Sequence, residues 1–224
     1  MGDVITRGFK SVIARKNAVS ASGIAYVGQA ITYNGYSSGP TVSYPTVSSN
    51  DIMLAFAASD NASNTGTPPA GWTKILEIDA ASSTTVSIFW KRAGGSEPAS
   101  EVWTSIFDTV EASGWVVVAY SGCAAAGSPI GSFASEGSGY STPKDISDTS
   151  TANNSMSVAI MSTSNGGANP FTWDSGTERY DNVLGSALTI AINDEIIAST
   201  GAYSVGGDLT NASSATEAVV TLIP

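Results

Sequence analysis

The sequence contains no histidine and a single cysteine, Cys123, among its 224 residues. Without histidine the chain lacks the commonest acid–base catalyst and the commonest metal ligand. One cysteine cannot form a disulfide within the chain, and zinc sites built from thiolates and imidazoles are therefore excluded. We expect Cys123 to be a small buried apolar residue beside the end of a strand.

Charged residues are also scarce, at 12% of the chain against about 25% in an average soluble domain. Ser, Thr, Gly, Ala and Asn replace them, as is typical of extracellular and virion β-proteins. Residues 1–16 carry four basic and one acidic side chain (net +3), whereas the other 208 residues carry 5 basic and 18 acidic (net −13). Because phosphate contacts need Lys and Arg, this acidic body argues against nucleic-acid binding.

Long apolar runs are absent too. Nothing reaches the roughly 18 apolar residues of a membrane span, and the first 20 residues lack the continuous apolar stretch of a signal peptide. We therefore expect no membrane segment and no signal peptide, and a protein that is made in the cytoplasm.

The first 29 residues differ from the rest and are predicted to form a basic docking arm. Apolar residues recur in it at helical spacing, with basic residues away from that stripe. Such a segment suits an amphipathic helix or an arm that orders on an acidic partner; the alternative is a frayed terminus. The predicted docking residues are Ile5, Arg7, Phe9, Lys10, Val12, Ile13, Arg15 and Lys16.

Residues 30–224 alternate short strand-like runs with clusters of Gly, Pro, Ser and Asn. Alternation of period two is clearest over residues 86–91, and no segment has the pattern of a long helix. Strands are predicted at 24–32, 41–47, 51–59, 72–78, 85–92, 102–107, 115–121, 145–149, 155–162, 171–173, 187–193, 201–205 and 218–223. The pattern indicates an all-β protein, a jelly-roll-like antiparallel β-sandwich.

The body also matches itself at a shift of 101 to 104 residues. In chain order, Asn50 falls on Asn154, residues 52–56 on 156–160, Trp72 on Trp173, Val86 and Ile88 on Leu188 and Ile190, and residues 117–118 on 219–220. We interpret the body as two pseudo-repeats, about 30–122 and 130–224. Each copy could close its own small sandwich, or both could share one; the short linker at 124–128 favours one compact unit.

Catalytic patterns are weak. Without histidine, nucleophilic catalysis would need a Lys–Ser or carboxylate arrangement, and no motif for either is present. Carboxylate pairs of the kind glycosidases use could be nominated, but they lie in turn-like sequence, and we expect solvated loop residues instead. The nominated pairs are Glu97 with Glu101, Asp174 with Glu178, and Asp194 with Glu195. The chain is predicted not to be an enzyme, and no catalytic residue or cofactor is expected.

Calcium is the one metal left open, because Asp and Asn oxygens suffice to bind it. The candidates are Asp60-Asn61 with Asn64, and Asp181-Asn182. Neither makes a defined loop motif, so we expect turn residues and no metal site.

The five tryptophans are the candidate platforms for sugar stacking. Trp90 and Trp115 lie inside apolar strands and are predicted core residues. Trp72 and Trp173 fall at equivalent places in the two pseudo-repeats, which favours a shared packing role over glycan binding.

Several motifs together resemble tailed-phage virion β-sandwich proteins. They are residues 51–56, 68–73, 90–93 with 96–98, and the strand ending at 119–122, with 219–224 as the last strand of the second copy. The resemblance covers most of 35–224 and offers no catalytic motif. It implies a capsid decoration (cement) protein on the capsid exterior, docked on the major capsid protein or another virion protein, with a homotrimer possible by analogy. The alternative is a carbohydrate- or receptor-binding module of a tail fibre or surface adhesin.

Overall fold

The computed structural model describes residues 23–35, 39–60, 66–78, 84–104, 106–107, 112–136, 144–164, 170–185, 188–210 and 215–224. These residues form 15 strands, all paired antiparallel, and no helix. The all-β prediction is confirmed.

Strands β1 to β7 make up what we call the first half of the body, and β8 to β15 the second half. The first-half strands are β1 (Ala25–Asn34), β2 (Thr41–Ser43), β3 (Ile52–Asp60), β4 (Thr73–Ile78), β5 (Thr84–Arg92), β6 (Ser100–Val102) and β7 (Ser113–Ser121). The second-half strands are β8 (Ile130–Glu136), β9 (Lys144–Ser150), β10 (Ser155–Thr163), β11 (Phe171–Trp173), β12 (Thr177–Leu184), β13 (Leu188–Ile197), β14 (Gly201–Leu209) and β15 (Ala215–Leu222).

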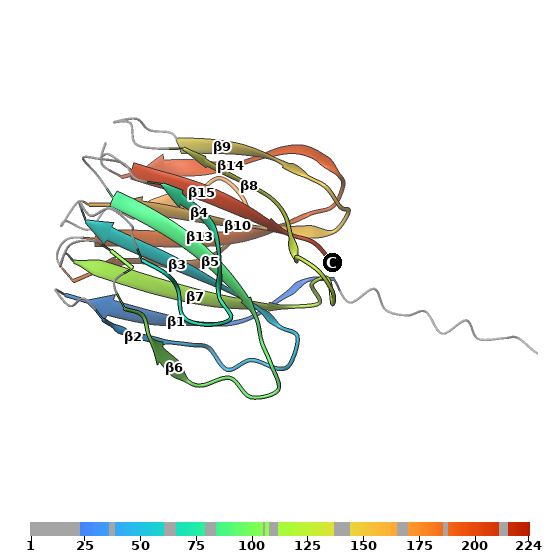
Figure 1. Ribbon diagram of the computed structural model, residues 1–224. Coiled ribbons are helices and arrows are strands. Elements are labelled where there is room, and N and C mark those ends of the chain that lie inside the picture. Colours follow the sequence, from blue (N-terminus) through green and yellow to red (C-terminus); the bar gives the residue numbers. More distant parts are fainter. Residues whose placement is uncertain are drawn as a thin grey trace, which may run out of the picture.

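The strands form four layers, which are stacked in Figure 1. Sheet I has the order β1-β7-β3-β5-β4 and comes wholly from the first half; sheet II has the order β12-β13-β10-β15-β8 and comes wholly from the second. They face each other, with β3 against β13, β5 against β15 and β4 against β8. The β2–β6 pair covers the far side of sheet I, and the β11-β14-β9 sheet covers that of sheet II.

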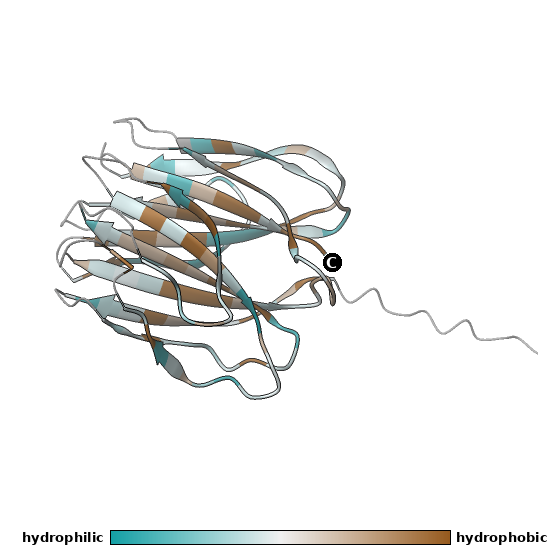
Figure 2. Ribbon diagram, viewed as in Figure 1, coloured by the Kyte–Doolittle hydropathy of each residue, from teal (hydrophilic) through white to brown (hydrophobic). Residues whose placement is uncertain are grey.

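The middle strands of sheets I and II are buried on both faces. In β3, Leu54 and Phe56 face the core between the two sheets, while Met53 and Ala55 face the core under β2–β6. This is why β3 and β7 read as continuous apolar runs rather than alternating ones. Figure 2 shows the hydrophobic residues gathered along these strands. One shared sandwich therefore lies between the halves, and each half has a second, smaller core of its own.

The two halves have the same strand order. If β11 is set aside, each half has seven strands, and in both the large sheet runs first-seventh-third-fifth-fourth while the second and sixth strands pair in the outer layer. The β-bulges recur as well. One bulge, in β1, lies opposite Ala119 and Tyr120, and its counterpart in β8 lies opposite Thr221 and Leu222. The other lies between Lys74 and Leu76 in β4, and its counterpart lies between Glu178 and Tyr180 in β12. The offsets, 102 and 104, are those of the sequence matches.

Backbone conformation marks the same correspondence. Asn50 and Asn154, 104 residues apart, are the non-glycine residues with positive φ among the described ones, at 73° and 57°. Each precedes the third strand of its half, and its N–H bonds the carbonyl oxygen of Ala93 or Ala198 respectively. Asparagine tolerates this left-handed conformation better than most residues, which gives the sequence match a physical cause.

Alanine at either position is expected to lower the free energy of unfolding by about 1–2 kcal/mol, the cost of the left-handed conformation for a residue with a Cβ. Asn50→Gly and Asn154→Gly are the matched controls and should be nearly neutral, because glycine adopts positive φ freely. Urea denaturation of the four variants measures this. Equal losses for Ala and Gly would contradict the conformational explanation.

The observed strands and boundaries differ from the predicted ones in several places; β2, for example, ends at Ser43, whereas a strand was expected over 41–47. β8 and β12 were not expected: β8 is rich in small residues, and β12 is an edge strand whose Glu178, Arg179 and Asp181 read as a loop. The sixth strand, expected at 102–107, lies at Ser100–Val102. Finally, β1 begins at Ala25, so residues 25–29, which the predicted boundary assigns to the arm, belong to sheet I.

Candidate functional site

The eight predicted docking residues lie outside the described residues. They are Ile5, Arg7, Phe9, Lys10, Val12, Ile13, Arg15 and Lys16. Docking through the arm therefore stays a prediction, and the candidate sites of the body are three clusters of polar and aromatic side chains.

The first cluster lies between the β2–β6 pair and sheet I. The rings of Trp72 and Trp103 meet edge to face with centroids 5.1 Å apart, and the ring of Tyr44 lies 5.5 Å from that of Trp72. Trp103 Nε1 donates to Tyr44 Oη at 2.8 Å, and that hydroxyl donates to Glu101 Oε2 at 2.7 Å. Burial and the bond to Glu101 raise the pKa of Tyr44 well above its ordinary value. It is a neutral phenol that joins the chain after β2 to β6, while Trp72 Nε1 donates to the same Glu101 Oε2 from the side of sheet I at 3.4 Å.

Lys91 joins the two carboxylates nominated beside this cluster. Its Nζ lies 2.7 Å from Glu97 Oε2 and 3.9 Å from Glu101 Oε2, and Glu97 Oε1 accepts the N–H of Gly94 at 2.7 Å. Burial alone would raise the pKa of Glu97, but the Gly94 N–H and Lys91 outweigh it and hold the pKa below its ordinary value. Glu97 is thus an ionised group held at both oxygens, whereas a glycosidase acid must carry a proton.

The expectation that the nominated carboxylates are solvated loop residues is wrong for most of them. The Glu97 side chain is only 10% exposed. Glu101 lies in β6, and Asp194 and Glu195 lie in β13. The sequence of β13 suggested a turn because Asp194 and Glu195 follow each other, although β13 lies between β12 and β10 and Asp194 is buried.

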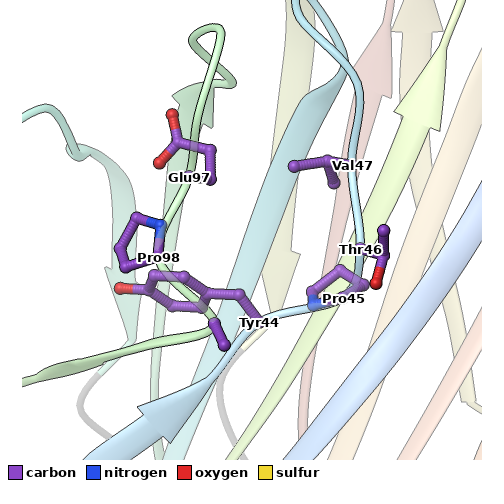
Figure 3. A pocket seen from close by; sticks show the side chains of 7 residues that line it. Tyr44, Pro45, Thr46, Val47, Glu97 and Pro98 are labelled. Carbon is purple, nitrogen blue, oxygen red and sulfur yellow. The ribbon is translucent and has the colours of Figure 1, made fainter.

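A small pocket opens beside the first cluster. Its volume is about 170 Å³, below the roughly 300–1,000 Å³ of typical small-molecule sites. Figure 3 shows the Tyr44 ring, Pro45 and Pro98 along its walls, with Glu97 at one side. The walls are of mixed polarity, and both oxygens of Glu97, the carboxylate among the lining residues, are already bonded. It has the size for one ring or a short aliphatic group and contains no pair of free catalytic groups.

The second cluster ties sheet II to its outer sheet. Asp148 Oδ2 accepts hydrogen bonds from Ser132 Oγ at 2.8 Å, Thr221 Oγ1 at 2.8 Å and Tyr203 Oη at 3.2 Å. The Tyr203 and Thr221 hydroxyls are 2.6 Å apart. One carboxylate thus joins β8, β9, β14 and β15. Burial is the main cause that raises the pKa of Tyr203, so this tyrosine is also a structural phenol.

The third cluster crosses between the halves, and we call it the Tyr–Asp clasp: Tyr26, Tyr120, Arg179 and Asp194. Asp194 Oδ2 accepts from Tyr120 Oη at 2.8 Å and from Arg179 Nε at 2.7 Å. The Arg179 guanidinium lies over the Tyr26 ring, 4.1 Å from its centroid, and the rings of Tyr26 and Tyr120 are in edge contact at 5.8 Å. Tyr120 is fully buried and Asp194 is 3% exposed. Burial, then the Asp194 charge, raise the pKa of Tyr120.

The tryptophans are packing residues. The Trp115 side chain is buried, which confirms its prediction, and Trp90 lies partly buried against the core between the sheets. Trp72 and Trp173 pack against the cores of their own halves, Trp173 less deeply. None of the five is among the exposed large hydrophobic side chains of the described residues.

Cys123 is buried against the core between the sheets, just after β7, as predicted. Burial raises the pKa of its thiol to about 12, which makes it inert. Across the described residues no group of three Cys, Asp or Glu side chains is placed to hold a metal ion. The Asp181-Asn182 pair lies in β12 and not in a turn, and Asp181 Oδ2 accepts the N–H of Phe171 at 2.9 Å. Within the same residues no helix has the length and apolarity to span a bilayer.

The sequence reasoning missed the partners in all three clusters. Tyr44 and Glu101 are 57 residues apart, and Tyr120 and Asp194 are 74 apart, so no local pattern connects them. One signal was available. Arg179 is a lone basic residue in an acidic stretch, and a guanidinium there calls for a carboxylate partner.

Comparison with known proteins adds no relative. No family model matches the chain, and neither a curated protein nor a solved structure matches it.

Proposed function

We propose that the chain is a virion structural protein of a tailed phage that decorates the capsid exterior, docks on the major capsid protein and stabilises the shell. The observation that carries the proposal is that each of the three polar clusters ties one β-layer to the next, and the pocket beside the first cluster holds only about 170 Å³. A layered body of this kind suits a mechanical role. The sequence resemblance and the basic arm support the major capsid protein as the partner.

The body supplies stiffness in this proposal. The Tyr–Asp clasp joins sheets I and II, and a carboxylate fastens each outer layer to its sheet. Glu101 of β6 contacts Lys91 of β5, and Asp148 of β9 accepts a hydrogen bond from Thr221 of β15. Because central strands are buried on both faces, pulling one away would expose apolar surface on both sides. A shell protein under internal pressure gains from such a body.

The duplication belongs to the same proposal. In each half the first strand lies beside the last and the last beside the third, a jelly-roll-like order, and the matching bulges and asparagines support descent of both halves from one unit. The arm, without residues 25–29 that belong to β1, is the proposed attachment segment. A trimer on a threefold site of the shell would place three arms on neighbouring subunits.

The truncated chain without residues 1–22 is expected to bind at least tenfold less to capsid shells that were assembled without this protein. The measurement is sedimentation of shells of the major capsid protein with purified chain, followed by gel quantification. Replacement of Arg7, Lys10, Arg15 and Lys16 by Gln should weaken binding in a salt-dependent way, because it removes the charges of the arm.

The matched control is Lys74→Gln, which removes an exposed cation of the body paired with Glu77 and should leave binding unchanged. Undiminished binding of the truncated chain would overturn the docking role of the arm. A particle composition with a handful of copies per virion instead of hundreds would place the chain in the tail.

A further inference from the structure

The Tyr–Asp clasp occurs at one side of the shared core only. The strand registers place the second-half counterparts of Tyr26 and Tyr120 at Ile130 and Leu222. The first-half counterpart of Arg179 is Ile75, since each is the extra residue at the bulge of its strand. The counterpart of Asp194 is Trp90, since each occupies the same pairing position opposite the third strand of its half. All four counterparts are apolar and pack against the core between the sheets. One corner of the interface is therefore polar, and its equivalent corner is apolar.

A second hydrogen-bonded contact between the halves, the Thr clasp, has the same asymmetry. Thr84 Oγ1 lies 3.1 Å from Thr216 Oγ1 and donates a hydrogen bond to the carbonyl oxygen of Ser162. In return, Thr216 Oγ1 donates to the carbonyl oxygen of Thr84 at 2.6 Å. Both threonines are fully buried. The registers place their counterparts at Leu188 and Gly114.

That counterpart corner is tightly packed and apolar. A Cβ added to Gly114 would collide with Leu184 and lie 3.4 Å from Leu188 Cδ2. The polar corners lie near opposite ends of the strands: Tyr120 is near the end of β7, whereas Thr84 and Thr216 are near the starts of β5 and β15. Each half thus brings complementary parts to both clasps, and neither half contains a complete set.

We propose that the two clasps make the pairing of the halves selective, so that a first half closes on a second half and not on the first half of another copy. The proposal rests on the duplication and not on the virion role. Two equivalent halves would pair equally well with their own kind, and duplicated chains would then join into mixed oligomers.

Pairing of like halves leaves buried polar groups without partners. Two first halves would place Tyr120 against Trp90 and Ile75 of the other copy, where its hydroxyl finds no carboxylate. Two second halves would place Asp194 against Leu222 and Ile130. A buried carboxylate that loses a hydrogen-bond donor is unfavourable. Pairing of two first halves and pairing of two second halves are therefore both weaker than the native pairing. Specificity can arise in this way, because the wrong partner leaves polar groups unpaired.

Position-specific cross-linking of the full chain tests this. In the native pairing Tyr26 contacts Arg179, so the exposed positions beside them, Ala25 and Glu178, lie at the same corner of the interface. In a pair of first halves, the same corner would instead bring together Ala25 of one chain and Lys74, the counterpart of Glu178, of another. All test chains carry Cys123→Ser. Chains with Ala25→Cys and chains with Lys74→Cys are mixed, unfolded in urea, refolded and treated with a bis-maleimide whose spacer is long and flexible enough to span two packed sheets.

The clasp variant carries Tyr120→Leu, Arg179→Ile and Asp194→Leu, which makes the polar corner resemble its apolar counterpart. We expect at least a tenfold rise in the covalent 25–74 dimer over the chains with intact clasps. The matched control is Leu222→Met at the counterpart corner, which should give no rise. A chain with both Ala25→Cys and Glu178→Cys reports native pairing by an intrachain link.

An unchanged 25–74 yield in the clasp variant, with the 25–178 link still formed, would overturn the proposal. The clasp variant could lose the 25–178 link without gaining the 25–74 dimer. In that case the milder double variant with Thr84→Val and Thr216→Val tests the proposal. It keeps the shape of both threonines and removes the hydroxyls of the Thr clasp. A threefold or greater rise in the 25–74 dimer supports selectivity, and no rise refutes it.

Discussion

Replacement of Trp103 by alanine should lower the free energy of unfolding by about 3–5 kcal/mol, the range for truncating a large aromatic residue in a core. Trp103 is fully buried between the β2–β6 pair and sheet I. Its ring is in edge contact with Trp72 at 5.1 Å and Phe89 at 5.2 Å, and its Nε1 holds Tyr44 Oη at 2.8 Å. The substitution removes these contacts and leaves a cavity that β-strands on both sides cannot close. Urea denaturation monitored by circular dichroism measures the loss.

Trp103→Phe is the matched control for this prediction. It keeps a ring in the site but removes the N–H, so part of the loss should be the hydrogen bond, about 1 kcal/mol, and the rest the reduced volume. Hydrogen exchange adds a local readout, because amides of β2 and β6 should lose protection before those of sheet II. A cost below about 1 kcal/mol for the alanine variant would mean that the outer layer does not depend on this ring.

The central strands could be predicted because their burial is recorded in consecutive residues. β3 and β10 lie under two layers, so both faces of each strand are apolar, and the predicted ranges fall within a residue of the observed ones. The self-match at about 104 residues came from the same strands, whose packing restricts substitution most. The left-handed Asn50 and Asn154 belong to this predictable part, since few residues adopt that conformation.

The strands at the rim of a sheet could not be predicted, because one face of each is exposed to solvent and carries polar residues. β12 carries Glu178, Arg179 and Asp181 among its eight residues, and such a segment resembles a loop when its neighbours are unknown. Its strand conformation depends on pairing with β13, which is a tertiary effect. The layer arrangement was left open for a related reason: apolar runs indicate burial on both faces but do not say which sheet covers which face.

The polar clusters were the least predictable part, and they changed the interpretation of the carboxylates. Asp194 follows an apolar run and precedes Glu195, so the sequence suggested a solvated turn. In the structure it is 3% exposed, and its donors come from two other strands, in different halves. Only the fold brings those donors to it. The predicted docking residues lie outside the described residues, and the body gives no information about them.

Asp194→Ala is the substitution expected to affect the joint between the halves most, with a loss of about 3 kcal/mol, at the lower end of the range for breaking a buried ion pair. The Tyr120 hydroxyl, fully buried, loses its acceptor. The Arg179 side chain is 25% exposed and can reach water, which keeps the loss from being larger. Glu77→Ala is the control: it breaks an ion pair with Lys74 whose side chains are 37% and 28% exposed, and exposed pairs contribute about 0–1 kcal/mol.

A double-mutant cycle shows whether the loss belongs to the contact between halves. With Tyr120→Phe and Asp194→Ala, each alone and together, the coupling energy should fall within about 0.5–3 kcal/mol, because the two groups share one buried hydrogen bond. The same cycle on Tyr120→Phe and Glu77→Ala should give a coupling near zero, since no contact joins those residues. Strictly additive losses for Tyr120 and Asp194 would mean that each acts through its own surroundings. In that case shape alone would hold the two halves together.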